Sequence, residues 1–331
     1  MVKLLDCTIR DGGHLNGWNF TKECVQASYD AAANAGADYF EIGYRVENPN
    51  PKLGDFARCE DDFLMSFIEK KDKCKIAVMI DAGKCSADKF QDYNPNKTPI
   101  EIIRIATYPQ KMDIAFDLAE KLHAKGYEIF MNFMAISRFQ EDHFNQINQW
   151  RNKNILSAVW FADSFGALFP EDVTVYGKKF RDLGFNKICF HSHNNLQLAF
   201  ANSLKAIEKG FYCIDASIYG MGRNAGNLPA ELITGYLNKT GEEKFNPEPY
   251  LNVIQQFYIE HFKKTPWGYG IHPLLGGLKN IHPQYIEELF NQKDMTIKDI
   301  ITTSELLKKN DQISFSKEFT DKIIKDLKES F

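Results

Sequence analysis

Residues 187–195 read Lys-Ile-Cys-Phe-His-Ser-His-Asn-Asn, a short apolar run that ends abruptly in polar side chains. Residues 187–193 have the length and composition of a β-strand that is buried on both faces. A pattern of helical period follows at residues 196–209, and residues 213–219 form another apolar run. A strand, a helix and a second strand in this order are typical of a parallel sheet.

The same alternation extends in both directions from this stretch. It predicts eight strands, at residues 4–9, 39–44, 75–81, 102–107, 128–135, 155–163, 187–193 and 213–219, with helical patterns between them and a last helix at residues 228–237. Eight units of about 30 residues favour a closed barrel over an open doubly wound sheet. We therefore expect an α/β fold, a (β/α)8 TIM barrel.

The alternation stops near residue 246. Pro247 and Pro249 open a mostly helical tail, which a Gly-, Pro- and His-rich segment interrupts at residues 267–277. We expect residues 1–245 to form the catalytic TIM-barrel domain and residues 246–331 to form a small C-terminal helical domain that packs on it.

The composition argues against several classes of protein. The 331 residues are 44% hydrophobic and 25% charged, which is the balance of a soluble globular chain, and the formal net charge of −4 argues against nucleic-acid binding. No apolar stretch is long enough to cross a membrane, and the first residues lack the apolar core of a signal peptide. Seven scattered cysteines without a C-x-x-C pair indicate free thiols in a reducing compartment, so we expect a cytoplasmic protein.

Polar residues gather where the predicted strands end, and this end of a TIM barrel carries the active site. His191 and His193 are two residues apart on a strand, so their imidazoles share a face and form a nitrogen pair suited to a divalent metal. Asp11 follows the first strand, which lies near the seventh in a closed barrel, and is the natural third ligand. The alternatives are hydrogen-bonded core or loop histidines, and a turn position for Asp11 before Gly12.

Two residues beside Asp11 have chemistry that suits an enolate. The Arg10 guanidinium can stabilise an enolate oxygen as charge develops, and His14 can act as a general base or acid near neutral pH. A salt bridge at the barrel floor or mouth is the alternative for Arg10, and an exposed loop position is the alternative for His14. The glycines from Gly220 to Gly226 predict a loop that approaches a ligand or closes over it.

Four motifs of the chain resemble those of the DRE-TIM metallolyases, a superfamily that includes hydroxymethylglutaryl-CoA lyase and the isopropylmalate and homocitrate synthases. Residues 6–14, DCTIRDGGH, resemble the D-x-T-x-R-D-G signature, and residues 191–195, HSHNN, resemble the H-x-H metal motif. Residues 219–227, YGMGRNAGN, resemble the glycine-rich loop after strand 8, and residues 163–166 resemble the end of strand 6. The branch that the chain resembles most is the 4-hydroxy-2-oxovalerate aldolases, which are pyruvate aldolases.

The resemblance implies a divalent metal, with Mn²⁺ expected first and Mg²⁺, Co²⁺ or Zn²⁺ as alternatives. It also implies a role for each residue at a motif position. These residues are Asp11, His191, His193 and Asn227 for the metal, Arg10 for the pyruvate enolate, His14 for the proton of the 4-hydroxyl group, Ser164 for the pyruvate carboxylate, and Glu41 beside the metal and substrate.

The chain departs from the family pattern in several places. Its glycine-rich loop lacks the catalytic cysteine of the hydroxymethylglutaryl-CoA lyases, and Asn195 stands where the synthases have an aspartate. Tyr269 lies in a segment that lines the site in the pyruvate aldolases, so we expect it to take part in catalysis. Arg223 in the loop and Arg45 after the second strand add positive charge that suits a phosphorylated, carboxylated or nucleotide-sugar substrate. A surface position is the alternative for both arginines.

These observations predict a divalent-metal-dependent aldolase that joins a pyruvate enolate to an aldehyde or cleaves the same bond. The alternatives are a Claisen-type acyltransferase that condenses acetyl-CoA with a 2-oxo acid, and a non-catalytic barrel used for sensing or scaffolding. The expected partners are a small 2-oxo acid and an aldehyde, without nucleic acid or membrane. A homo-oligomer is also expected. The nearest branch typically has an acylating aldehyde dehydrogenase partner, which the altered tail puts in doubt.

Overall fold

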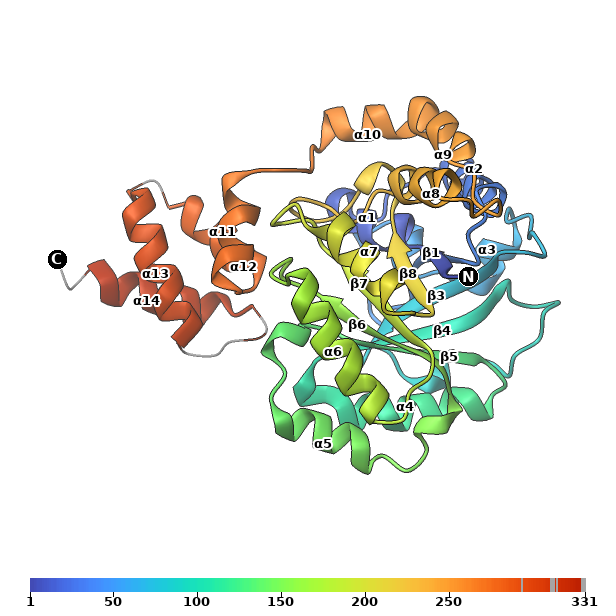
Figure 1. The fold of residues 1–331 in the computed structure, drawn as a ribbon, viewed down its shortest axis with the longest axis horizontal. Coiled ribbons are helices and arrows are strands. Elements are labelled where there is room, and N and C mark those ends of the chain that lie inside the picture. Colours follow the sequence, from blue (N-terminus) through green and yellow to red (C-terminus); the bar gives the residue numbers. More distant parts are fainter. Residues whose placement is uncertain (293, 310–312, 314, 329–331) are drawn as a thin grey trace.

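The computed structural model describes residues 1–292, 294–309, 313 and 315–328. Its centre is a closed barrel of eight parallel strands that follow one another in sequence order (Figure 1). This confirms the predicted (β/α)8 TIM barrel, in which the carboxyl ends of all strands meet at one mouth. The strands are β1 Lys3–Asp6, β2 Tyr39–Tyr44, β3 Lys75–Asp81, β4 Ile100–Thr107, β5 Glu128–Phe133, β6 Leu156–Asp163, β7 Ile188–Ser192 and β8 Cys213–Ala216.

Helices cover the outside of the barrel, except between β3 and β4, where the chain forms turns and the one-turn 3-10 helix Ala87–Lys89. Among the described helices, none combines the length and the apolar character needed to cross a membrane. The barrel helices are α1 Thr8–Asn16, α2 Lys22–Asn34, α3 Asp61–Met65, α4 Met112–Ala124, α5 Glu141–Gln149, α6 Pro170–Asp182, α7 Ala199–Glu208 and α8 Ala230–Lys239.

The first strand is shorter than predicted, and this changes how the site is built. The apolar pattern predicted a strand over residues 4–9, but β1 ends at Asp6 and α1 begins at Thr8. The Asp6 carboxylate accepts hydrogen bonds from the backbone N–H and the hydroxyl of Thr8, at 2.8 and 2.5 Å, and such local bonds compete with the sheet ladder. Arg10, Asp11 and His14 therefore lie on a helix, whose side chains tilt back toward the barrel mouth.

The barrel interior is filled in layers. Inward-facing side chains from every strand form an apolar layer, which includes Leu5, Tyr39, Ala77, Ile102, Phe130, Trp160, Cys189 and Cys213. Residues two positions further along a strand face inward again, one step nearer the mouth. In β2, β4, β7 and β8 these positions hold Glu41, Arg104, His191 and Asp215, all of them buried. A polar layer therefore lies directly above the apolar one.

The tail divides between two hydrophobic cores. The helices α9 Glu248–Val253 and α10 Ile259–Lys264, with the π-helix Ile254–Tyr258 between them, contribute Tyr250 and Tyr258 to the main core of the barrel. The later helices share a separate core around Tyr285 and Ile286. They are α11 Ile271–Lys279, α12 Pro283–Phe290, α13 Ile297–Lys309 and α14 Lys317–Lys328.

The α11–α14 unit stands against one side of the barrel mouth, beside the loops that follow β5 and β6 (Figure 1). The Ser137 hydroxyl donates a hydrogen bond of 2.6 Å to the carboxamide oxygen of Asn280. The rings of Phe165 and His282 lie 6.0 Å apart, and Ile313 joins Phe165 in a small buried cluster. The tail thus shields part of the mouth from water.

The aromatic packing between β6 and the outer helices gives a test of the barrel core. Phe161 is fully buried, and its ring lies 5.6 Å from that of Phe180 and 5.3 Å from that of Phe190. We expect Phe161→Ala to lower the free energy of unfolding by about 3–5 kcal/mol, because a large cavity forms. Phe169→Ala removes a half-exposed ring of the same type and should change it by less than about 0.5 kcal/mol. Chemical denaturation of both variants measures the difference, and equal effects would contradict this account of the core.

Candidate metal centre and active site

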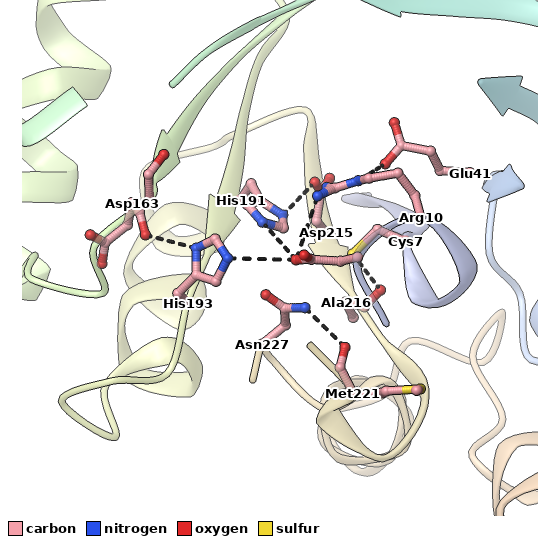
Figure 2. A network of polar contacts seen from close by, with 12 residues as sticks. Cys7, Arg10, Glu41, Asp163, His191, His193, Asp215, Ala216, Met221 and Asn227 are labelled. Carbon is pink, nitrogen blue, oxygen red and sulfur yellow. Dashed lines mark hydrogen bonds and ion pairs between the residues drawn. The ribbon is translucent and has the colours of Figure 1, made fainter. Parts of the chain in front are cut away.

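Three side chains that the sequence analysis selected as metal ligands meet at the mouth. Asp11 Oδ2 lies 3.4 Å from His191 Nε2 and 3.6 Å from His193 Nε2. The two imidazole planes are nearly perpendicular, with ring centroids 4.9 Å apart. Asp11 comes from α1. His191 comes from β7, and His193 is the residue just after β7 (Figure 2). All three side chains are buried.

Each histidine is held by a hydrogen bond at its other ring nitrogen. His193 Nδ1 lies 3.0 Å from the backbone oxygen of Asp163, which can only accept, so Nδ1 carries the proton and Nε2 keeps a lone pair. His191 Nδ1 lies 2.9 Å from Asp215 Oδ2 (Figure 2). A carboxylate or carbonyl behind the ring is the arrangement that orients metal-binding histidines.

The site contains buried polar atoms that the protein leaves without a hydrogen-bond partner. Within the described part of the chain they include both carboxylate oxygens of Asp11, His191 Nε2 and Asn227 Oδ1. The Asn227 amide nitrogen donates to the Met221 backbone oxygen at 3.1 Å, so its oxygen is left free on the side of the histidines (Figure 2). Each unpaired buried acceptor costs about 1–3 kcal/mol. A divalent cation would satisfy this set of nitrogen and oxygen donors at once, so the residues fit a metal.

Asp11 and His191 belong to a closed ring of charged and polar contacts. Arg10 joins Asp11, at 3.5 Å, to Glu41, at 2.6 Å. Arg104 then joins Glu41, at 3.3 Å, to Asp215, at 2.8 Å, and Asp215 contacts His191, which returns to Asp11. We call these six residues, Asp11, Arg10, Glu41, Arg104, Asp215 and His191, the charged ring. Its three carboxylates and two guanidinium groups leave a net charge of −1. This charge favours the binding of a cation beside Asp11 and His191.

Protonation states in the site are set for metal binding at neutral pH. Burial disfavours the charged form of Asp11, but the positive charge of Arg10 and the nearby imidazoles of His191 and His193 outweigh it and hold the pKa of Asp11 well below its usual range. Burial lowers the pKa of His193 to about 3, so its imidazole is neutral. An ionised carboxylate and a neutral imidazole are the forms that bind metals.

His14 lies beside the metal residues in a pocket of aromatic rings. It follows Asp11 by three residues on α1 and therefore lies on the same side of the helix. Its ring is 4.6 Å from that of Trp18 and 5.7 Å from that of Tyr44. Burial and the positive charge of Arg223 lower the pKa of His14 well below its ordinary value, so the ring is a neutral proton acceptor. Its Nε2 is buried without a partner among the described residues.

The other selected residues have different surroundings. Glu41 uses its carboxylate to hold Arg10 and Arg104. The Ser164 hydroxyl accepts a hydrogen bond of 2.8 Å from the backbone N–H of Ala135. Tyr269 is 69% exposed, and no described contact joins it to the charged ring, so its expected place in the site is not supported.

The two arginines expected to bind an anion differ sharply. Arg45 is buried and forms an ion pair of 2.8 Å with Asp61, so its charge is already balanced and the expectation of a substrate charge partner is wrong for it. Arg223 is half-buried in the glycine-rich loop, and its side chain has no ion pair or hydrogen bond within the described part of the chain. Its charge lowers the pKa of His14 on one side, and adds to burial in lowering that of His282 on the other. Arg223 thus lies between the metal residues and the α11–α14 unit.

Sequence reasoning missed Asp215 and Arg104. The signal was present, because each is a charged residue inside an otherwise apolar strand run, Cys-Ile-Asp-Ala and Ile-Ile-Arg-Ile-Ala. A buried charge in a strand needs a partner on another strand. Trp160 completes the pairing, since its indole N–H donates to Asp215 at 2.6 Å and its ring lies 4.6 Å from the Arg104 guanidinium.

Comparison with known proteins assigns the chain to a family. The family model described as HMGL-like matches residues 1–254, and the chain belongs to this family. The 4-hydroxy-2-oxovalerate aldolase of Thermomicrobium roseum is 30% identical over 244 residues, covering 72% of this chain and 67% of the relative. The oxaloacetate decarboxylase of Mycobacterium tuberculosis is 22% identical over 307 residues, covering 90% and 89%.

Solved structures show the same fold. The N-terminal domain of a candidate aldolase from Bacteroides vulgatus superposes with a TM-score of 0.77 at 31% identity, covering 91% of this chain and 99% of that one. The HMG-CoA lyase of Bacillus subtilis has a TM-score of 0.65 at 16% identity, covering 80% and 95%. The second likeness concerns the fold alone.

The hydrogen bond between Asp215 and His191 generates a prediction on metal affinity. We expect Asp215→Asn to weaken Mn²⁺ binding about 10- to 100-fold, because His191 loses the carboxylate that orients it. Asp163→Asn is the matched control, since the hydrogen bonds of the Asp163 carboxylate within the described part of the chain come from loop N–H groups, and the backbone oxygen of Asp163 holds His193. Isothermal titration calorimetry measures both. Equal affinity losses in the two variants would show that Asp215 acts through stability alone.

Proposed function

We propose that this member of the HMGL-like family is a metal-dependent carbon–carbon lyase, an aldolase that forms or cleaves a bond between a pyruvate enolate and an aldehyde. The observation that carries the proposal is a buried metal-binding set, Asp11, His191 and His193, next to a buried guanidinium. The Arg10 Nη2 atom has no partner among the described residues, although its other nitrogens are held by Asp11 and Glu41. A rigid donor aimed beside a metal site suits an oxygen on which charge develops.

The relatives support an enolate as the common feature. Loss of carbon dioxide from oxaloacetate and cleavage of 4-hydroxy-2-oxovalerate both leave the enolate of pyruvate, and the two relatives are named for these substrates. This chain retains one set of residues that serves either reaction. We favour the aldolase because His14, a neutral base, lies beside the metal residues, and aldol cleavage requires a hydroxyl proton to be removed.

A divalent cation held by Asp11, His191 and His193, with Asn227 as a proposed fourth ligand, would polarise the keto group of a bound 2-oxo acid. Mn²⁺ is the ion that we propose, with Mg²⁺, Co²⁺ or Zn²⁺ as alternatives. Arg10 donates to the oxygen that becomes negative, and Glu41 keeps the guanidinium in place. These groups are ordered before the substrate arrives, so little reorganisation accompanies the reaction.

Two residues handle the remaining polar groups of the substrate. His14 accepts the proton of the hydroxyl group in the cleavage direction and returns it in the addition direction. The Ser164 hydroxyl accepts the Ala135 N–H, which leaves its own proton free to donate to the carboxylate of the 2-oxo acid.

The aldehyde partner is proposed to be anionic, with a carboxylate or a phosphate. Arg223 lies in the loop that ends at Asn227. No described acidic side chain forms an ion pair with it, although its positive charge acts on the Glu287 carboxylate of α12 and opposes the rise that burial causes in the pKa of Glu287. The loop is held from both sides, since the Asn194 N–H donates to the Gly226 oxygen at 2.8 Å and the Gly268 N–H donates to the Asn224 oxygen at 3.1 Å. A positioned guanidinium at the mouth recognises such an anion through paired hydrogen bonds.

The setting in the cell is also a proposal. All seven cysteines are free and buried, as suits a reducing compartment, and we propose a cytoplasmic enzyme that works as a homo-oligomer on small molecules. An acylating aldehyde dehydrogenase is the partner suggested by the family resemblance.

Proton exchange of pyruvate in deuterated buffer tests the central chemistry. We expect exchange to stop after exhaustive chelation and to return when Mn²⁺ is added, and Asp11→Asn should lose it because the carboxylate ligand is gone. His14→Gln should keep Mn²⁺ affinity but slow aldol cleavage about 10²- to 10⁴-fold. Exchange that survives chelation would refute the metal proposal. Thiol release from acetyl-CoA in the presence of a 2-oxo acid would instead favour an acyltransferase.

Arg223 provides a test of the aldehyde. We expect Arg223→Gln to lower kcat/KM for succinic semialdehyde or glyceraldehyde 3-phosphate by about 10- to 100-fold, because a hydrogen bond to a charged group is lost. Propanal, which has no charge, is the control and should be used equally well by both proteins. Arg223→Lys keeps the charge and should recover part of the loss. A wild-type enzyme with no preference for the anionic aldehydes would contradict the proposal.

A further inference from the structure

We propose that Cys7 is an additional ligand that the metal centre offers to sulfur-seeking divalent cations such as Zn²⁺ and Co²⁺, and does not use for Mg²⁺ or Mn²⁺. The inference rests on the metal centre of the proposed function and not on its aldol chemistry. Cys7 lies between β1 and α1, is fully buried with Cys189 and Cys213 in the apolar layer of the barrel interior, and contacts the Ala216 backbone oxygen (Figure 2).

The geometry places three different ligand types around one point. Cys7 Sγ, a carboxylate oxygen of Asp11 and a ring nitrogen of His191 all lie within 4.8 Å of one another. The 4.8 Å is an upper limit, since Asp11 Oδ2 and His191 Nε2 are 3.4 Å apart. Even at that limit each atom would lie about 2.8 Å from the common centre, whereas zinc bonds are about 2.3 Å to sulfur and about 2.0–2.2 Å to nitrogen or oxygen. Each atom therefore needs to move inward by less than about 1 Å to share an ion.

Two properties of the Cys7 thiol bear on metal binding: its hydrogen bonding is weak, and its burial raises its pKa well above the ordinary value, so that a cation has to displace a firmly held proton. The Cys7 thiol makes one weak hydrogen bond, of 3.3 Å, to the Ala216 backbone oxygen. Binding replaces this S–H bond by a sulfur–metal bond and releases one proton to the solvent, so no oxidant or reductant is required. His193 Nε2 lies 3.6 Å from Asp11 Oδ2 but is not one of these mutually close atoms, so it would have to move toward the sulfur to complete a set of one sulfur, one oxygen and two nitrogen donors. Such mixed sets suit Zn²⁺ and Co²⁺.

The nature of the ion decides whether sulfur takes part. Mg²⁺ and Mn²⁺ prefer oxygen donors and gain little from a thiolate. With these ions Cys7 keeps its proton and its bond to Ala216, and the coordination position near the sulfur stays open for substrate. With Zn²⁺ or Co²⁺ the sulfur occupies that position and strengthens binding. Cys7 thus governs which ion the centre retains.

Two other inward-facing cysteines offer matched controls. Cys189 and Cys213 belong to the apolar layer of the barrel interior, and their thiols contact the Lys187 and Ile214 backbone oxygens at 3.9 and 3.6 Å. Neither belongs to a metal-ligand cluster among the described residues. Cys189→Ser therefore changes a buried thiol of the same barrel without changing the proposed ligand set.

Titration of the full chain with Co²⁺ tests the proposal by absorption spectroscopy. The visible bands report an ion bound by the protein, and an intense near-ultraviolet band reports a cobalt–sulfur bond. We expect both in the wild type and in Cys189→Ser, whereas Cys7→Ser and Cys7→Ala should keep the visible bands and lose the ultraviolet band. Zn²⁺ affinity should fall about 10- to 100-fold in the Cys7 variants while Mn²⁺ affinity stays the same.

The two groups of absorption bands test the role of Cys7 and the existence of the metal centre separately. Visible bands without an ultraviolet band in the wild type would overturn the role of Cys7 and leave the metal centre intact. No visible bands in the wild type would overturn the metal centre and with it the proposed function. An ultraviolet band that persists in both Cys7 variants would assign the sulfur to another cysteine and reject the proposal. Retained visible bands in the Cys7 variants show that these proteins are folded.

Discussion

The pairing of buried charges inside the barrel is the constraint on which the rest of the structure depends. The charged ring connects α1, β2, β4, β7 and β8 through ion pairs and hydrogen bonds of 2.6–3.5 Å. Each charge is buried, so removing one partner leaves another uncompensated, at a cost of about 3–5 kcal/mol. Elements far apart in the sequence are thus held in one register. Burial of the apolar layer below stabilises the barrel, and the pairing of charges in the charged ring favours this one arrangement of the strands over others.

The same contacts prepare the chemistry. Arg10 keeps Asp11 ionised and is itself held by Glu41, while Asp215 and the Asp163 backbone turn the two histidines so that their Nε2 atoms face Asp11. Among the described residues, both carboxylate oxygens of Asp11, His191 Nε2 and Arg10 Nη2 have no hydrogen-bond partner, and they are the donors and acceptors of the proposed cation and 2-oxo acid site. The α11–α14 unit shields one side of the mouth, and Arg223 lies between it and the metal residues. The charged ring therefore both stabilises the barrel and orients the residues of the proposed active site.

Much of the fold and half of the site could be predicted from local patterns. Strand periodicity located all eight strands, and His191 and His193 were recognisable because alternate residues of a strand share a face. The start of α1 was missed because the apolar run continues to Ile9, and a side-chain bond from Asp6 to Thr8 ends the strand earlier. The prediction that Arg45 binds a substrate anion was wrong because its partner, Asp61, lies on the next helix. No local sequence pattern around Arg45 indicates that this ion pair forms. Tyr269 was placed by motif position alone, and the backbone there carries it to the surface.

The sequence by itself determined the barrel, the three residues at its mouth and the family, since these depend on periodicity and on short motifs. Only the tertiary structure decided which charges are paired and which are free. It showed that Arg104 and Asp215 close the charged ring, that Arg223 forms no described ion pair, and that the Cys7 sulfur lies within 4.8 Å of ligand atoms of Asp11 and His191. The physical reason is that a buried charge or thiol acquires its function from neighbours on other strands. Those neighbours are brought together by closure of the barrel and not by proximity along the chain.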